Sequence, residues 1–482
     1  MYQIKDFFLG KNDGKKEARY KQDFDLYFYD HNNIYKKIME PDKCLVLGKK
    51  GTGKTILGEY MKKQASASAD WFCEMCSYKD FTFQELIHLK SSDIQPNEYL
   101  SIWEWVILLQ LSKFCINDNS IPESRTKMEL EKFINSNYDS LHLNANKIIE
   151  ITKNNKLSGS LFTGISKVLG EEGESTKYST GNYLNYLNQL SSTVIKLLSD
   201  SNNKYTLIYD ELDDRFRNES LYKNSIISLI KAVDKLNLLM HDNGIDCKVI
   251  LLLRTDIFQV LNDPDLNKVK QDNSITIEWG SSNNRNSPLF DMVFNKVKKS
   301  VPELADIRRS DLFFKLFPDK IKGEFSDHFI LSRSFFRPRD VITYLNLIIQ
   351  QYPSERSFNW KGFKDVEGQY SSYFFNEIRN ELCGHASDTV IDEGFLLLKQ
   401  FKHINFKYSK IYTYLEERKR LYKHIDLEEL LKMFFDFGVL GNRWYNTRTK
   451  TWYYSWAYRE NATIDFDKEF VIHKGVRKEL SL

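Results

Sequence analysis

The chain contains 482 residues, more than one ordinary domain holds, so we expect two or three domains. Hydrophobic residues make up 41% of the chain and charged residues 28%, a balance typical of a folded globular protein that excludes a wholly disordered chain. The formal net charge is only +3, which excludes nucleic-acid binding through overall charge and leaves local basic surfaces as the only route.

Sorting signals and cysteines give the next expectations. Residues 1–20 carry charges without an apolar segment, so we expect no signal peptide. No stretch approaches the ~18 uninterrupted apolar residues of a membrane span, so we expect a cytoplasmic protein with no membrane partner. The closest cysteine pair, Cys73 and Cys76, lacks a second pair or a histidine partner, which favours reduced core thiols over a zinc or redox site.

A phosphate-binding loop is the first motif along the chain. Residues 30–40 are predicted to form a short amphipathic helix, followed by an apolar strand at 44–47. The sequence GKKGTGKT comes at once after this strand and is followed by a predicted helix over 54–66. It fits the pattern G-x-x-x-x-G-K-[ST] in its required place between a strand and a helix.

The residue types of this loop suit a nucleoside triphosphate. Glycines leave no Cβ between the backbone N–H groups and a phosphate chain, and the helix N-terminus adds a positive dipole end. Lys54 is expected to reach the β- and γ-phosphates, and the Thr55 hydroxyl is expected to ligate Mg²⁺. The predicted ATP-binding residues are Gly48, Lys49, Lys50, Gly51, Thr52, Gly53, Lys54, Thr55 and Ile56.

A second predicted strand at 70–78 is followed by a break in the regular alternation, which we interpret as a helical insertion over about 79–200. Residues 96–116 have the apolar spacing of a buried helix, and residues 182–198 return to helical spacing. Residues 117–181 are rich in Asn, Ser, Lys and Gly, and form either a partner surface or a variable excursion.

The next strand carries the second motif. Residues 204–209 run directly into Asp210 and Glu211, the arrangement of a Walker B strand. We expect Asp210 to hold Mg²⁺ and Glu211 to orient or deprotonate the attacking water. An exposed acidic turn is the alternative, but unpaired carboxylates at the end of a buried strand are costly.

A helix over 218–241 and an apolar strand over 247–253 follow, and the strand ends in Arg254 and Thr255. Because ligands bind at the carboxyl ends of parallel strands, we assign one of these two residues as a sensor of the γ-phosphate. The alternative is a simple helix cap at Thr255 and Asp256. Residues 273–280 alternate as a last strand, after a polar crossing segment.

From residue 287 to about 417 the pattern is helical throughout and predicts a lid domain. Arg337 and Arg339 flank Pro338 at the head of a long apolar helix, where proline is well placed. We expect one of these arginines to reach the nucleotide; a salt-bridged helix start is the alternative.

The last region predicts a helix over 421–437 and a β-hairpin with strands at 439–440 and 451–456, which together indicate a winged helix. Arg443, Arg448 and Lys450 in the expected turn, with basic residues over 418–423, are candidates for phosphate contacts. Winged helices also dock proteins, so DNA and an effector protein both remain open as partners.

Together, the phosphate loop, Asp210–Glu211, the Arg254 strand tip, the RPRD helix and the terminal wing resemble the AAA-related bacterial P-loop ATPases near the initiator and STAND-type branches. The resemblance implies an ATP-driven switch, often oligomeric, in families frequently linked to mobile elements or antiviral defence. It leaves the arginine finger open, with Arg285, Arg308 and Arg309 as candidates.

The expected fold class is α/β: a P-loop NTPase core with a parallel sheet over 1–299, carrying the helical insertion, then an all-α lid over 300–417 and a winged helix over 418–482. The leading functional hypothesis is an ATPase. A slow or non-hydrolysing sensor that docks a partner is the alternative. A small-molecule kinase is less favoured, since Glu211 suits the activation of water.

Overall fold

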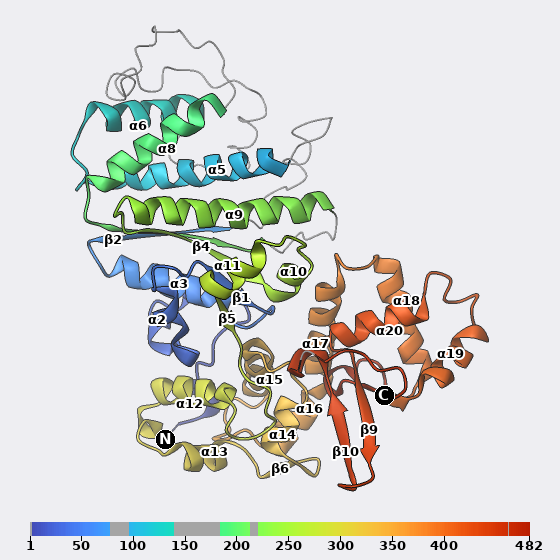
Figure 1. Cartoon of the computed structure of the whole chain (residues 1–482). Coiled ribbons are helices and arrows are strands. Elements are labelled where there is room, and N and C mark those ends of the chain that lie inside the picture. Colours follow the sequence, from blue (N-terminus) through green and yellow to red (C-terminus); the bar gives the residue numbers. More distant parts are fainter. Residues whose placement is uncertain (1, 78–95, 139–183, 213–219, 461) are drawn as a thin grey trace. The chain divides into compact units, whose positions relative to one another are not determined.

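The computed structural model describes residues 2–77, 96–138, 184–212, 220–460 and 462–482. The described chain forms two compact units, which are considered separately (Figure 1). The sheet unit contains residues 33–49 and 57–277, and the helical unit contains residues 1–32, 50–56 and 278–482.

The sheet unit is built on five parallel strands in the order β2-β3-β4-β1-β5. Their bounds are β1 (Leu45–Gly48), β2 (Trp71–Ser77), β3 (Lys204–Asp210), β4 (Cys247–Arg254) and β5 (Ser274–Ile277). Strands β1, β3 and β4 are buried almost throughout, as expected for parallel strands covered on both faces. In this order, β4 lies between β1, which leads into the phosphate loop, and β3, which ends in Asp210.

Helices cover both faces of this sheet. On one face, α9 (Ser220–Asp242) packs against β4, and on the other α3 (Lys54–Ser66) approaches closely at Gly58. A Cβ at Gly58 would lie 3.2 Å from Met75 Sδ, so the glycine permits this approach. The shorter helices α2 (Ile34–Ile38), α10 (Thr255–Gln259) and α11 (Leu266–Asn273) complete the unit. Helix α11 lies in the polar crossing segment expected before β5.

The expected insertion is part of the core of this unit. Helix α5 (Pro96–Asn117) lies along α9, and α6 (Arg125–Tyr138) and α8 (Leu184–Ser199) pack against it (Figure 1). Trp103 of α5 donates from Nε1 to the Ser225 carbonyl at 2.9 Å. The remaining residues of the predicted partner surface or variable excursion, 139–181, lie outside the described residues.

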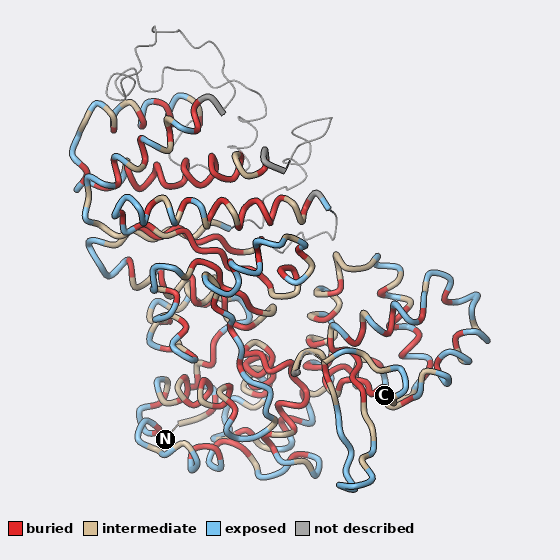
Figure 2. The backbone as a smooth tube through the Cα atoms, in the orientation of Figure 1, coloured by how far each residue is buried: buried red, intermediate tan, exposed pale blue. Residues whose placement is uncertain are grey.

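Helix α5 also accounts for the longest apolar segment in the described part of the chain. Residues Tyr99–Asn117 are long and apolar enough to cross a membrane, but 83% of the window is buried inside the protein. Figure 2 shows α5 buried along nearly its whole described length, in contrast to the striped burial of α9. Its all-round hydrophobicity therefore fits a central core helix.

The helical unit begins with an N-terminal segment that the sequence placed with the ATPase core. It contains η1 (Ile4–Asp6), α1 (Gly14–Tyr20), η2 (Phe24–Tyr27) and η3 (His31–Asn33). Backbone and side-chain bonds tie it to later helices: Ile4 N donates to Glu355 O at 2.7 Å, and Asn346 Nδ2 donates to Gly10 O at 2.9 Å. These long-range bonds explain why residues 1–32 belong to this unit.

Most of the region over 288–382 is helical, as predicted. Its elements are α12 (Pro288–Ser300), η4 (Pro302–Leu304), α13 (Arg309–Leu316), α14 (Ser326–Leu331), α15 (Pro338–Gln351), α16 (Trp360–Asp365) and α17 (Glu367–Leu382). One small hairpin of β6 (Lys320–Ile321) and β7 (Glu324–Phe325) interrupts the helices. Its turn uses Lys322 and Gly323, both at positive φ.

The C-terminal module combines helices with a four-stranded antiparallel sheet in the order β10-β9-β11-β8. Its elements are α18 (Asp388–Phe401), β8 (Asn405–Phe406), α19 (Tyr408–Glu416), α20 (Leu427–Asp436), β9 (Leu440–Asn446), β10 (Thr451–Ser455), α21 (Ala457–Glu460), β11 (Glu469–Ile472) and η5 (Lys474–Val476). Strand β8, before residue 418, joins the sheet of the predicted wing through β11.

The hairpin differs in detail from the prediction. Strand β9 runs to Asn446, so Asn442 and Arg443 are paired strand residues, and only residues 447–450 form the turn. Asn442 is buried and exchanges hydrogen bonds with the Asp465 backbone, which explains how a polar residue continues the strand.

Candidate nucleotide-binding site

The phosphate loop has the backbone conformation that its glycines predict. Gly51 and Gly53 have φ angles of +80° and +107°, in the region where a side chain is disfavoured. A Cβ at Gly51 would also lie 3.1 Å from Cβ of Arg339. Lys54 and Thr55 open α3 directly after this turn. The loop therefore presents a tight, glycine-lined turn followed by a helix N-terminus, which fits a phosphate chain.

Residues 50–56 of the loop belong to the helical unit and contact the head of α15. Arg339 N lies 3.4 Å from the Gly51 carbonyl oxygen. Glu377 of α17 lies between two cations, 3.4 Å from Lys50 Nζ and 3.1 Å from Arg339 Nη1. Although burial opposes it, the charges of Lys50 and Arg339 hold the pKa of Glu377 below its usual range. Glu377 thus joins the loop to α15 and α17.

The two arginines of the RPRD segment have different environments. Arg337 is 1% exposed, and its guanidinium bonds to Asp340, with Nε 2.9 Å from Oδ2, and to Glu381. Despite the opposing effect of burial, these carboxylates raise the pKa of Arg337 above its ordinary value. Arg337 therefore has the salt-bridged helix-start role that the sequence offered as the alternative, whereas Arg339 lies beside the loop.

Trp279 fixes the backbone of the loop from another direction. Its indole Nε1 donates to the Thr52 carbonyl oxygen at 2.9 Å, and its ring stacks on His31 with the centroids 4.7 Å apart. Gly14 approaches the Ile56 backbone, where a Cβ would lie 3.2 Å from Ile56 N. No motif in the sequence marked Trp279, His31, Gly14 or Glu377, because each lies far from the loop along the chain.

At the edge of the sheet, the strand tips place polar residues as predicted. Gly48 pairs in register with Arg254 across β1 and β4. Arg254 is 7% exposed, and its Nε donates to Asp256 Oδ1 at 3.0 Å. Helix α10 starts at Thr255, and neither Thr255 nor Asp256 acts as its N-cap residue, which is Arg254. Asp256 therefore fixes the orientation of the Arg254 guanidinium.

The Walker B carboxylates end β3. Asp210 is 3% exposed and pairs in register with Ser77 of β2. Glu211 follows with φ +61°, a left-handed conformation that a side chain with a Cβ adopts at a cost of about 1–2 kcal/mol. Its Oε2 accepts a hydrogen bond from the Ser77 hydroxyl. Such local strain is typical of functional sites, where the surrounding structure maintains it.

These residues fit Mg²⁺ and ATP by their chemistry. The loop offers backbone N–H groups, an ammonium and a hydroxyl, and the strand tip offers a buried carboxylate oxygen, the ligand type that Mg²⁺ prefers. In the part of the chain that the structure describes, no group of three or more His, Cys, Asp or Glu side chains could hold a metal by itself. Substrate phosphates complete a typical Mg²⁺ site, so a single carboxylate and a hydroxyl suffice.

The cysteine pair of β2 carries no catalytic signal. Burial raises the pKa values of Cys73 and Cys76 to about 12, and both thiols are free. A thiol with such a pKa is a poor nucleophile and metal ligand. The pair therefore behaves as partly buried side chains of a strand.

The three arginine-finger candidates also differ. Arg285 stacks on Phe314, with the guanidinium carbon 5.1 Å from the ring centroid. Arg309 is bound to Asp291 and donates to the Arg285 carbonyl at 2.7 Å. The side chain of Arg308 is 88% exposed, with Asp311 3.7 Å away.

A known protein family matches one segment of the helical unit. Residues 287–379 match the family described as the FunZ-associated C-terminal helical domain, and this segment includes Arg337, Arg339 and Glu377. No curated protein matches the chain. A solved structure of the Aeropyrum pernix Orc1 protein in complex with DNA is similar over 96% of this chain and 92% of that chain, at 10% identity and a TM-score of 0.35. The strand order and the register of the parallel sheet define the fold of the sheet unit.

Proposed function

We propose that the protein is a Mg²⁺-dependent ATPase that acts as a nucleotide-driven molecular switch. The observation that carries this proposal is the order of the sheet. Strand β4 lies between β1, which leads into the phosphate loop, and β3, which ends in Asp210 and Glu211. Parallel strands end at one edge, so both motifs and Arg254 serve the same edge of the sheet.

Each residue then has a chemical role. The loop residues 48–56 bind the phosphate chain through backbone N–H groups, and Lys54 offsets charge on the β- and γ-phosphates. Thr55 and Asp210 hold Mg²⁺, which when bound neutralises charge that develops on the phosphates. Glu211, directed by Ser77, orients water for attack on the γ-phosphate and accepts its proton. Arg254, held by Asp256, responds to the γ-phosphate.

The contacts of the loop with α15 and α17 support a switch. Arg339 and Lys50 share the carboxylate of Glu377. An anionic phosphate chain in the loop competes with Glu377 for both cations, because the attraction between opposite charges grows stronger as the distance between them falls. Nucleotide binding would thereby alter the packing of the α15 head against α17 within the helical unit.

Two substitutions test the ATPase proposal. We expect Lys54→Ala to abolish ATP binding, because the loop loses the ammonium that offsets phosphate charge. We expect Glu211→Gln to bind ATP but to turn over at least ~100-fold more slowly, since general-base catalysis contributes about that much. Equilibrium binding and steady-state phosphate release measure the two effects. Equal turnover in Glu211→Gln would contradict the assignment of the base.

A slow or non-hydrolysing sensor is the second candidate. The environments of Arg285 and Arg309 favour it, because both guanidiniums are engaged within the helical unit. Under the ATPase proposal, the exposed Arg308 is our candidate for the arginine finger that one subunit of a homo-oligomer supplies to the nucleotide of its neighbour. A single-turnover assay distinguishes the two: hydrolysis that rises with protein concentration and is lost in Arg308→Ala supports the ATPase.

We further propose that residues 418–482 form a winged helix, because α20 is followed by the β9–β10 hairpin, and that the protein is cytoplasmic. Arg448 and Lys450 lie exposed in the turn of the hairpin and suit phosphate contacts, so a DNA partner is the proposal we favour over an effector protein. A context in antiviral defence or mobile elements remains part of this proposal through the family resemblance alone. The DNA partner is tested by measuring ATP turnover with and without DNA. We expect DNA to stimulate turnover, and we expect this stimulation to fall steeply as the salt concentration rises.

A further inference from the structure

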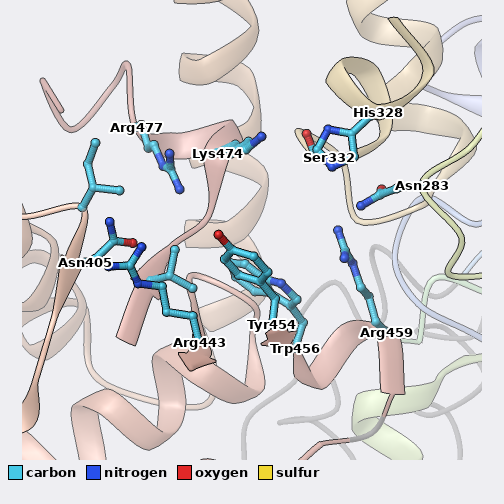
Figure 3. Close-up of a pocket in the computed structure, with 12 residues that line it drawn as sticks. Asn283, His328, Ser332, Asn405, Arg443, Tyr454, Trp456, Arg459, Lys474 and Arg477 are labelled. Atoms are coloured by element: carbon cyan, nitrogen blue, oxygen red, sulfur yellow. The ribbon is translucent and has the colours of Figure 1, made fainter. Parts of the chain in front are cut away.

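A cavity of about 270 Å³ lies in the helical unit, against one face of the C-terminal sheet (Figure 3). Each strand of that sheet contributes a residue to its wall. The lining includes Asn283, Arg443, Tyr454, Arg459, Lys474 and Arg477. The volume lies just below the roughly 300–1,000 Å³ of pockets for drug-sized molecules, so the cavity suits a small ligand.

The lining is rich in cations and poor in anions. Arg443, Arg459, Lys474 and Arg477 all reach this space, and Figure 3 shows their side chains around one opening. Two carboxylates beside the cavity compensate half of this charge. Glu469 pairs with Arg443 at 2.8 Å, and Glu324 pairs with Lys474 at 2.7 Å.

Within the described residues, neither of the other two guanidiniums forms an ion pair, and the more distant charge of Glu324 acts favourably on Arg477. Arg477 donates to the Ile472 carbonyl oxygen, from Nε at 3.0 Å and from Nη2 at 2.8 Å. The side-chain amide of Asn283 lies 2.9 Å from Arg459 Nη2 and accepts from it once its oxygen faces the guanidinium. The buried Nε of Arg459 has no acceptor in this part of the chain.

The titration behaviour of the cluster agrees with an excess of positive charge. Burial, followed by the charge of Arg333, lowers the pKa of Arg477 to about 10. Burial also lowers the pKa of Lys474, although its bond to Glu324 opposes the shift. All four cations are partly buried, and partly buried cations without a matching carboxylate favour the binding of a counter-charge.

We propose that this cavity is a binding site for a phosphate-bearing ligand, held by Arg459 and Arg477 with Lys474 and Arg443 beside them. Guanidinium forks match phosphate oxygens in pairs, which suits these two arginines. Tyr454, on β10 opposite Arg443, adds a partly exposed ring to the same wall, where the planar group of a nucleotide can stack. The site belongs to the helical unit alone and is distinct from the phosphate loop.

Binding to the full-length Lys54→Ala protein tests this site with the loop disabled. The probes are inorganic phosphate, a nucleoside monophosphate and a 5′-phosphorylated single-stranded oligonucleotide, titrated by calorimetry at constant ionic strength set with chloride. In this background, Arg477→Gln is compared with Arg356→Gln, which removes the same charge from an exposed position outside the cavity and outside the hairpin turn.

We expect Arg477→Gln to weaken phosphate binding about tenfold or more, and Arg356→Gln to leave inorganic phosphate binding unchanged. The probe that binds most tightly identifies a free nucleotide or a strand end as the source of the phosphate. Equal phosphate affinity in both variants, or no binding to the Lys54→Ala parent, would overturn the proposal. If Arg477→Gln does not fold, Lys474→Gln is compared with Arg356→Gln in the same way.

Discussion

At the scale of single residues, the backbone conformation of Glu211 lowers the stability of the fold at the candidate site. Its φ of +61° directly after a buried strand is a conformation in which glycine would be more stable. The carboxylate that the proposed chemistry needs therefore occupies a position that stability alone would assign to glycine. Ser77 of the neighbouring strand fixes the side chain through its hydroxyl.

We expect Glu211→Gly to raise the free energy of unfolding by about 1 kcal/mol, because it removes the Cβ that disfavours this conformation. The same variant should lose ATP turnover together with the carboxylate. Glu211→Ala is the matched control, since it removes the carboxylate but keeps the Cβ and should show no gain. Denaturant unfolding monitored by circular dichroism measures the difference, and an equal stability of the two variants would argue against strain at this position.

At the scale of elements, the head of α15 holds two arginines with different tasks. Arg337 is wholly internal and neutralises Asp340 and Glu381, and Asp340 in turn accepts from the Phe335 backbone at 2.9 Å. Arg339 is partly exposed and borders the phosphate loop. The first arginine therefore builds the helix start, and the second connects it to the loop.

Substitution of each arginine by alanine separates these tasks. Arg337→Ala should lower the free energy of unfolding by about 3–5 kcal/mol, because it leaves buried carboxylates unpaired. Arg339→Ala should change stability by less than about 1 kcal/mol, since its ion pair is partly exposed, yet reduce the stabilisation that ATP gives to the fold. Thermal unfolding with and without Mg²⁺-ATP measures both effects. A large loss of stability in Arg339→Ala would contradict this division.

At the scale of the whole chain, the C-terminal module is attached to the rest of the helical unit through a buried histidine. His473 is fully buried; its Nε2 lies 3.1 Å from Tyr458 Oη, and its Nδ1 accepts from Gly475 N at 3.1 Å. Its ring also stacks on Phe374 of α17. Gly475 permits this approach, because a Cβ there would lie 2.6 Å from Phe374.

This contact predicts an acid-sensitive helical unit. Burial first, and then the charges of Arg459, Arg477 and Arg333, push the pKa of His473 well below its ordinary value. The folded chain therefore leaves this ring neutral where the unfolded chain binds a proton, and stability falls as the pH drops below about 6.5. The slope attributable to this group is at most ~1.4 kcal/mol per pH unit.

The corresponding experiment compares unfolding between pH 7.5 and about 5 in three proteins. His473→Asn should be less stable at neutral pH, because it loses packing, but should show a shallower decline on acidification. His241→Gln, a substitution at an exposed histidine, serves as the control and should follow the parent. Identical slopes in His473→Asn and the parent would contradict the assignment of the acid sensitivity to His473.

The sequence by itself determined those features that depend on local pattern. The structure confirms the glycine-rich turn between β1 and α3, the strands that end in Asp210 and Arg254, and helices α3, α5, α9 and α15. Glycine spacing, buried β-branched runs and helical periodicity are encoded within a few neighbouring residues, so they can be recognised without tertiary information.

Only the tertiary structure decided which distant residues meet. It assigned Arg339 rather than Arg337 to the loop, added Glu377 and Trp279, and placed Arg443 in a paired strand against a cavity instead of in the hairpin turn. It also grouped residues 1–32 with the helical unit. These results depend on contacts between segments hundreds of positions apart, where burial and charge compensation select the partner, and no local pattern carries that information.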